Sequence, residues 1–211
     1  MHLHKYFAVL LVLAASACAS LPPPLPGSAV VGQRNLTGRI SVQYKDESDR
    51  QEAFHGRFDW LQTDERIEVS VLDPLGQSVA LLSTDAAGQT SELTLRNGEK
   101  ISGTIPEDLT ERVLGWRLPV SGLRYWLDGK PAPGSGATLE VDTDAAQGAA
   151  RLLQDGWTIR YPAQALDAAP KRIDLSYSGQ GRQVELRLVI DRRDPAPAPA
   201  AFKSLRAVPA P

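Results

Sequence analysis

Between residues 35 and 193, apolar and polar side chains alternate in one segment after another, and this period of two constrains the fold more than any other feature. In segment 36–44, Leu36, Ile40 and Val42 fall on one face and Arg39 on the other. Because successive side chains of a strand point to opposite faces, each segment is predicted to be a strand with one buried side. The same pattern recurs in segments 54–60, 67–71, 157–161, 173–177 and 184–190.

The connections between these segments carry hairpin signals. Asn97-Gly98 and Asp155-Gly156 match the two-residue type I′ turn, and the SGQG stretch at 178–181 is rich enough in glycine for another. Most of the segments are too close together for a crossover helix, which parallel strands would require. The sequence therefore predicts a mainly β fold with an antiparallel sheet.

A small helical insertion interrupts the strands. Pro106 suits a first helical turn, and Leu109, Val113 and Trp116 recur at the spacing of one helix face. A second short apolar piece covers residues 123–127. Two small helices over one large apolar sheet face would either enclose a hydrophobic cavity or cover strands that close and pack solidly. Periodicity leaves both possibilities open.

The N-terminus has the pattern of a secretory signal. A basic start precedes an apolar run that is too short to span a bilayer, and Ala15, Ser16 and Ala17 fit a cleavage site. The only cysteine, Cys18, follows immediately and cannot form an internal disulfide. This arrangement resembles the bacterial lipoprotein signal, which implies lipidation of Cys18. The alternative is an ordinary secreted protein cleaved after Ala17.

Composition divides the rest of the chain. We expect a signal peptide at 1–17, a proline-rich tether at 18–34, one folded domain at 35–193 and a disordered Pro/Ala-rich tail at 194–211. The formal net charge of −2 is spread without any block of like charge, so no nucleic-acid partner is expected.

Catalytic patterns are missing from the sequence. His55 lies on the polar face of its predicted strand, where a solvated surface histidine is the simplest interpretation. Neither a nucleophile elbow, nor a phosphate-binding glycine loop, nor metal-ligand spacing occurs. The chain is therefore expected not to be an enzyme and to need neither metal nor cofactor.

The stretch LDPLG at 72–76 predicts a tight turn with an unusual tip. Asp73, Pro74 and Gly76 occupy the first, second and fourth places of a four-residue turn, as type I geometry prefers. Leu75 is left at the third place, where its side chain points outward.

Taken together, Cys18, the strand ending in RFDW, the LDPLG turn, LRYWLDG, QDGWTIRY and the final alternating strand resemble the LolB family. The resemblance implies an unclosed antiparallel β-barrel, covered by short helices around a hydrophobic cavity that holds acyl chains. It further implies a monomer on the periplasmic face of the outer membrane, anchored through Cys18. Such a protein accepts acylated lipoproteins from a periplasmic carrier and inserts them into the membrane through a loop that corresponds to Pro74, Leu75 and Gly76.

The apolar strand and helix faces supply the candidates for the acyl cavity, although core packing is the simpler interpretation of each aromatic residue. The candidates are Ile40, Val42, Phe58, Trp60, Val69, Val71, Val113, Trp116, Trp126, Trp157, Ile159, Leu175, Leu186 and Leu188. Two alternatives remain: a soluble periplasmic lipoprotein carrier of the same fold, and a structural lipoprotein that binds a protein partner and has a packed interior.

Overall fold

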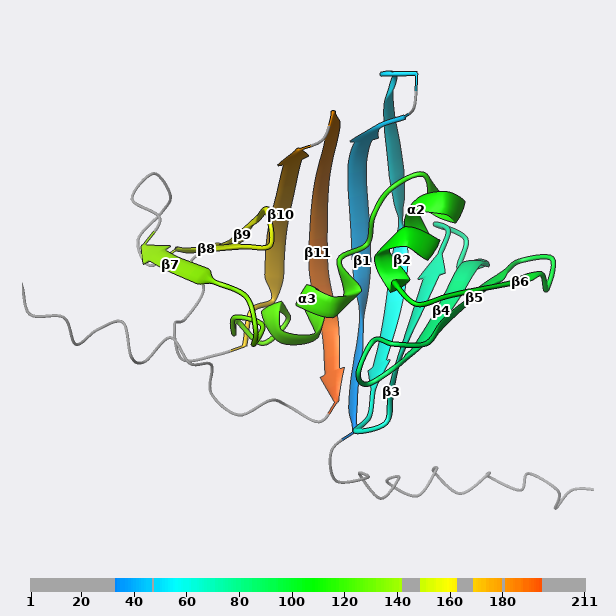
Figure 1. The fold of residues 1–211 in the computed structure, drawn as a ribbon, viewed down its shortest axis with the longest axis horizontal. Helices are drawn as coiled ribbons and strands as arrows, with labels where there is room; N and C mark the ends of the chain where they lie inside the picture. The colour runs from blue at the N-terminus through cyan, green and yellow to red at the C-terminus, as the bar shows by residue number, and fades with distance from the viewer. Residues whose placement is uncertain (1–32, 47, 142–148, 163–168, 180, 195–211) are drawn as a thin grey trace, which may run out of the picture. The chain divides into compact units, whose positions relative to one another are not determined.

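The computed structural model describes residues 33–46, 48–141, 149–162, 169–179 and 181–194. They form one antiparallel sheet of 11 strands in the order β6-β5-β4-β3-β2-β1-β11-β10-β9-β8-β7 (Figure 1). Within the described part of the chain β6 and β7 each pair on one side only, so the predicted unclosed antiparallel architecture is confirmed. The strands are β1 Arg34–Lys45, β2 Gln51–Gln62, β3 Arg66–Leu72, β4 Ser78–Asp85, β5 Ser91–Leu95, β6 Lys100–Gly103, β7 Ala137–Val141, β8 Ala150–Gln154, β9 Trp157–Tyr161, β10 Arg172–Gly179 and β11 Arg182–Asp194.

The centre of the sheet joins the two ends of the domain, because β1 pairs with β11 as well as with β2. Leu36, Ile40 and Val42 of β1 are buried and Arg39 between them is exposed, as the alternation predicts. All six predicted strands are present. The first described strand begins at Arg34 and the last ends at Asp194, one residue outside the predicted domain at each end. Cys18, the signal, the tether up to residue 32 and the tail beyond Asp194 lie outside the described residues.

Two helices cover the apolar side of the sheet, α2 Pro106–Leu114 and α3 Val120–Trp126 (Figure 1). Pro106 begins α2 as predicted, and Gly115 ends it in the left-handed conformation with φ 81°. The prediction that Trp116 belongs to this helix is wrong, because the glycine turns the chain before it. Trp116 is nevertheless only 2% exposed and contacts the Phe54 ring. No helix in the described ranges is long and apolar enough to cross a membrane.

One of the two predicted type I′ turns is correct. Asp155 and Gly156 both have positive φ, 52° and 78°, and they join β8 to β9. At Asn97-Gly98 only the glycine does, with φ 85°. The Gly98 N–H donates to the Leu95 carbonyl at 2.9 Å, so the four-residue turn begins at Leu95, one residue earlier than predicted, and Gly98 is its last residue. A three-residue loop of this kind also favours glycine at its left-handed position.

Strands β4 to β8 were not predicted from the alternation. In β4, Leu81 and Leu82 are adjacent leucines that point to opposite faces, and Leu82 is buried whereas Leu81 is 37% exposed. An apolar residue on the outer face hides the period of two, and strands of four or five residues such as β5 and β6 are too short to establish one.

Candidate functional site

The turn that carries Leu75 is fixed by Asp73. The carboxylate Oδ1 of Asp73 accepts hydrogen bonds from the backbone N–H groups of Leu75 and Gln77, both at 2.9 Å. Its backbone carbonyl accepts the Gly76 N–H at 2.9 Å, which is the bond of the predicted four-residue turn. Arg96 binds the other carboxylate oxygen at 3.0 Å. The Gln77 bond and then the Arg96 bond lower the pKa of Asp73, so the carboxylate stays ionised.

Leu75 itself is the most exposed large apolar residue of those described. Its side chain is 84% exposed, whereas the next, Ile105, is 48% exposed. An ordered turn thus presents one leucine to the surroundings, with its backbone held by Asp73 and its side chain free.

A cleft of about 590 Å³ opens on the helix-covered side of the sheet. Tyr44, Trp116, Tyr177 and Val184 supply its apolar and aromatic lining. Its rim is charged, and includes Glu111 of α2 and Arg117 of the segment between the helices.

A second cleft of about 330 Å³ shares Arg117, Tyr177 and Arg182 with the first. It extends to Trp126 of α3 and Trp157 of β9. Both volumes fall in the range of roughly 300–1,000 Å³ that is usual for ligand sites. The two clefts therefore adjoin at the same three side chains and lead toward three of the four tryptophans.

Ion pairs hold the boundary between these clefts. Arg182, at the start of β11, pairs with Glu111 of α2. Arg117 pairs with Glu111 at 3.2 Å and with Asp108 at 2.9 Å. The side chains of Arg117 and Arg182 are 35% and 51% exposed, so water screens these pairs.

The candidates for the acyl cavity come together, but mostly as packed core. Twelve belong to one buried cluster, Val113 packs against it half-buried, and Val71 is buried outside it. Of the fourteen, only Trp116, Trp126 and Trp157 line the two clefts. The twelve in the cluster are Ile40, Val42, Phe58, Trp60, Val69, Trp116, Trp126, Trp157, Ile159, Leu175, Leu186 and Leu188.

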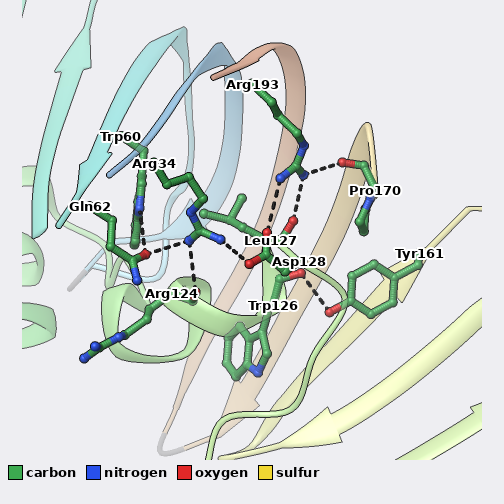
Figure 2. Close-up of polar contacts among 10 residues, drawn as sticks. All are labelled: Arg34, Trp60, Gln62, Arg124, Trp126, Leu127, Asp128, Tyr161, Pro170 and Arg193. Carbon is green, nitrogen blue, oxygen red and sulfur yellow. Dashed lines mark hydrogen bonds and ion pairs between the residues drawn. The ribbon is translucent and has the colours of Figure 1, made fainter. Parts of the chain in front are cut away.

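The sequence analysis missed a largely buried polar cluster at the C-terminal end of α3. Asp128 there forms ion pairs with Arg34, at the start of β1, and with Arg193, at the end of β11 (Figure 2). We call these three residues the Asp128 clasp. The two arginine side chains are 12% and 11% exposed. Since the arginines lie 94 and 65 positions from Asp128, nothing in the linear sequence links them.

Backbone carbonyls complete the Asp128 clasp. Arg34 donates to the Arg124 carbonyl at 3.0 Å, and Arg193 donates to the carbonyls of Leu127 and Pro170 at 2.7 and 2.6 Å. Burial lowers the pKa of Arg193 to about 10, which still leaves the guanidinium protonated at neutral pH. The clasp therefore joins α3 to one end of the central strand pair, where β1 begins and β11 ends.

The remaining predicted polar group, His55, lies exposed on the outer face of β2, with Nδ1 3.0 Å from the Ser41 hydroxyl. In the part of the chain that the structure describes, no group of three His, Cys, Asp or Glu side chains could hold a metal ion.

Comparison with known proteins gives consistent matches. The sequence profile described as "Outer membrane lipoprotein LolB" matches residues 33–192. A protein of Cupriavidus pinatubonensis named "Outer-membrane lipoprotein LolB" is 37% identical over 189 residues, covering 85% of this chain and 89% of that protein. Proteins of the same name from Cupriavidus necator and Thiobacillus denitrificans are both 34% identical, covering 87% and 89% of this chain and 92% and 95% of theirs. A solved structure of a LolA superfamily protein from Nitrosomonas europaea aligns with a TM-score of 0.35 at 10% identity, over 75% of this chain and 84% of that one.

Proposed function

The chain belongs to the LolB family of outer-membrane lipoproteins, and we propose that it takes acylated lipoproteins from a periplasmic carrier and inserts them into the outer membrane. The observation that carries this proposal is the 84% exposure of Leu75 on a turn that Asp73 holds in place. A folded domain gains nothing in stability from an apolar side chain in water. A leucine so placed fits contact with a lipid surface, where its side chain would leave water.

The acyl chains of the cargo would enter through the two tryptophan-lined clefts. Each methylene that leaves water contributes about 0.8 kcal/mol, so a chain of a dozen carbons does not cross water at a useful rate. Passage from one apolar interior directly to another removes most of that barrier. Direction then follows from tighter binding at each successive partner, with the membrane last.

Because most of the cavity candidates are packed together, the interior must loosen to hold acyl chains. The clefts already reach the buried Trp116, Trp126 and Trp157, beside Glu111, Arg117 and Arg182. We assign the entrance to this place, where the ion pairs of α2 with the sheet are screened by water.

Anchoring and insertion are separate tasks in this proposal. A lipid on Cys18 would keep the domain at the periplasmic face of the outer membrane, and Leu75 would bring the cleft-bearing domain to the lipid surface. Burying one leucine side chain contributes about 1.5–3 kcal/mol, which is enough to bias an orientation but too little to anchor a protein.

The test is transfer of a lipoprotein from a loaded periplasmic carrier to this chain with Cys18→Ser, followed by insertion into vesicles. Leu75→Glu is expected to leave acceptance unchanged, because Leu75 lines neither cleft, and to reduce insertion about tenfold or more. Leu153→Glu is the matched control, since Leu153 is an outer-face leucine that is 36% exposed. Normal insertion by Leu75→Glu, or an equal loss in both variants, would contradict the role of the loop.

The packed interior also favours one rival, a lipoprotein that binds a protein partner and holds no acyl chain. The same assay separates the two functions. If the chain accepts no lipoprotein, and native mass spectrometry finds no acylated ligand bound to it, the partner-binding function replaces the proposed one.

A further inference from the structure

A basic hollow lies on the outer face of the sheet, away from the helices. It measures about 460 Å³ and includes Arg39 of β1, His55 and Arg57 of β2, and Arg187 of β11. Pro74 and Val189 add apolar walls. Among the described residues, no acidic side chain lines it. We call it the outer-face hollow.

The strand register forces like charges together there. Arg39 lies directly opposite Arg57 in the β1–β2 pair. Two like charges directly opposite each other on one face of an antiparallel pair are destabilising, and sheets favour opposite charges at such positions. An anion between the two guanidinium groups would remove the repulsion.

The acidic groups nearby leave this positive charge only partly compensated. Asp191 pairs with Arg39 at 3.1 Å, and Asp174 is shared by Arg187 and Arg172, each at 2.7 Å. No ion pair or hydrogen bond to another side chain reaches Arg57 from the described residues. Asp59, two positions along on the same face of β2, is exposed and does not line the hollow.

The outer-face hollow also adjoins the Leu75 turn. Pro74, which lines it, is the residue immediately before Leu75, and Leu72 lies opposite Arg57 in the β2–β3 pair. A surface that receives Leu75 would therefore meet the arginines at the same time.

We propose that the outer-face hollow binds the phosphate of an anionic phospholipid headgroup while Leu75 enters the apolar layer. This inference rests on the proposed membrane role of Leu75 and adds a second, chemically different contact. Guanidinium groups bind phosphate oxygens through paired N–H donors, and Pro74 and Val189 suit the less polar start of the lipid. Two contacts fix the tilt of the domain on the membrane, which a single leucine does not.

The test uses the chain with Cys18→Ser and two double variants that lose equal charge. Arg39→Gln/Arg57→Gln removes two of the three arginines that line the outer-face hollow. Arg66→Gln/Lys130→Gln is the control. Arg66 and Leu72 are the two ends of β3 and are about 20 Å apart, which is more than a Debye length. Lys130 follows Asp128, which contacts Arg34 at that same end of the sheet.

Flotation with vesicles of phosphatidylcholine, with and without phosphatidylglycerol, measures membrane partition. The first variant should partition into the phosphatidylglycerol vesicles about thirtyfold less than the parent, since each basic residue at an anionic surface contributes about fivefold. The control should stay within about twofold of the parent. On pure phosphatidylcholine all three proteins should partition alike.

Equal losses in both double variants, or none in the first, would overturn the proposal. Calorimetric titration with inorganic phosphate separates the sources of the anion: tight phosphate binding by the parent without preference for phosphatidylglycerol would overturn the lipid headgroup in favour of a free anion. Acceptance of lipoprotein from the carrier is measured in parallel. If the chain accepts no lipoprotein, the proposed function is wrong, whatever the vesicle results. If it accepts lipoprotein but its membrane partition does not depend on Arg39 and Arg57, only this inference is wrong.

Discussion

The two ends of the helical cover are held to the sheet by the same kind of interaction in opposite surroundings. At the end of α3, Asp128 binds two arginines whose side chains are 12% and 11% exposed. At α2, Glu111 binds two arginines whose side chains are 35% and 51% exposed. Exposed ion pairs contribute about 0–1 kcal/mol, whereas removing one partner of a buried pair costs about 3–5 kcal/mol. By these ion pairs, the cover is strongly held at the α3 end and weakly held at the α2 end, where the buried side chain of Leu109 supplies a further contact with the core.

This difference bears on where cargo enters. Both tryptophan-lined clefts share Arg117 and Arg182, which belong to the weakly held end. If α2 moves while the Asp128 clasp keeps α3 in place, the clefts widen without unfolding the central strands. Elements that move for function generally come from the least stable parts of a structure.

The largest expected effect comes from breaking the strongly held end. Asp128→Asn leaves Arg34 and Arg193 buried without a counter-charge, and should lower the free energy of unfolding by about 3–5 kcal/mol. Urea unfolding of the full chain measures this. Asp108→Asn, which loses one exposed pair with Arg117, is the control and should cost less than about 1 kcal/mol. Similar losses in the two variants would abolish the contrast between the ends.

Features that follow a local sequence pattern could be predicted, and contacts between residues far apart in the sequence could not. Alternation located β1, β2 and β11, and three turn-forming residues located the exposed Leu75. The Asp128 clasp follows no local pattern, because it exists only once β1, β11 and α3 are in place. The Arg39–Arg57 juxtaposition likewise depends on strand register, which alternation alone does not give. Packing inside the sheet was left open, since periodicity reports which face is buried but not how tightly it is filled.

A milder change at the strongly held end should have an intermediate effect. The Tyr161 hydroxyl, whose pKa burial raises, donates to the Trp126 carbonyl at the end of α3 at 3.1 Å. Tyr161→Phe removes this donor from a buried acceptor and should cost about 1–2 kcal/mol in the same urea experiment. Tyr125→Phe, on the same helix but half-buried, should cost less. A larger loss from Tyr125→Phe would show that contacts other than this bond position α3.

The smallest effect on stability, and the sharpest test of the comparison, should come from the weakly held end. Arg182→Gln removes the pair with Glu111 and should change the free energy of unfolding by less than about 1 kcal/mol. Amide hydrogen exchange should nevertheless become up to about fivefold faster in α2 and stay unchanged in α3, because only α2 loses a link to the sheet. Added salt should reproduce the change in the parent, since these charges are exposed.

Arg192→Gln, an exposed arginine of the same strand outside both clefts, is the control. Faster exchange in α3 as well would mean that the two helices open together, and the Asp128 clasp would then be a stabilising contact without a part in directing the motion.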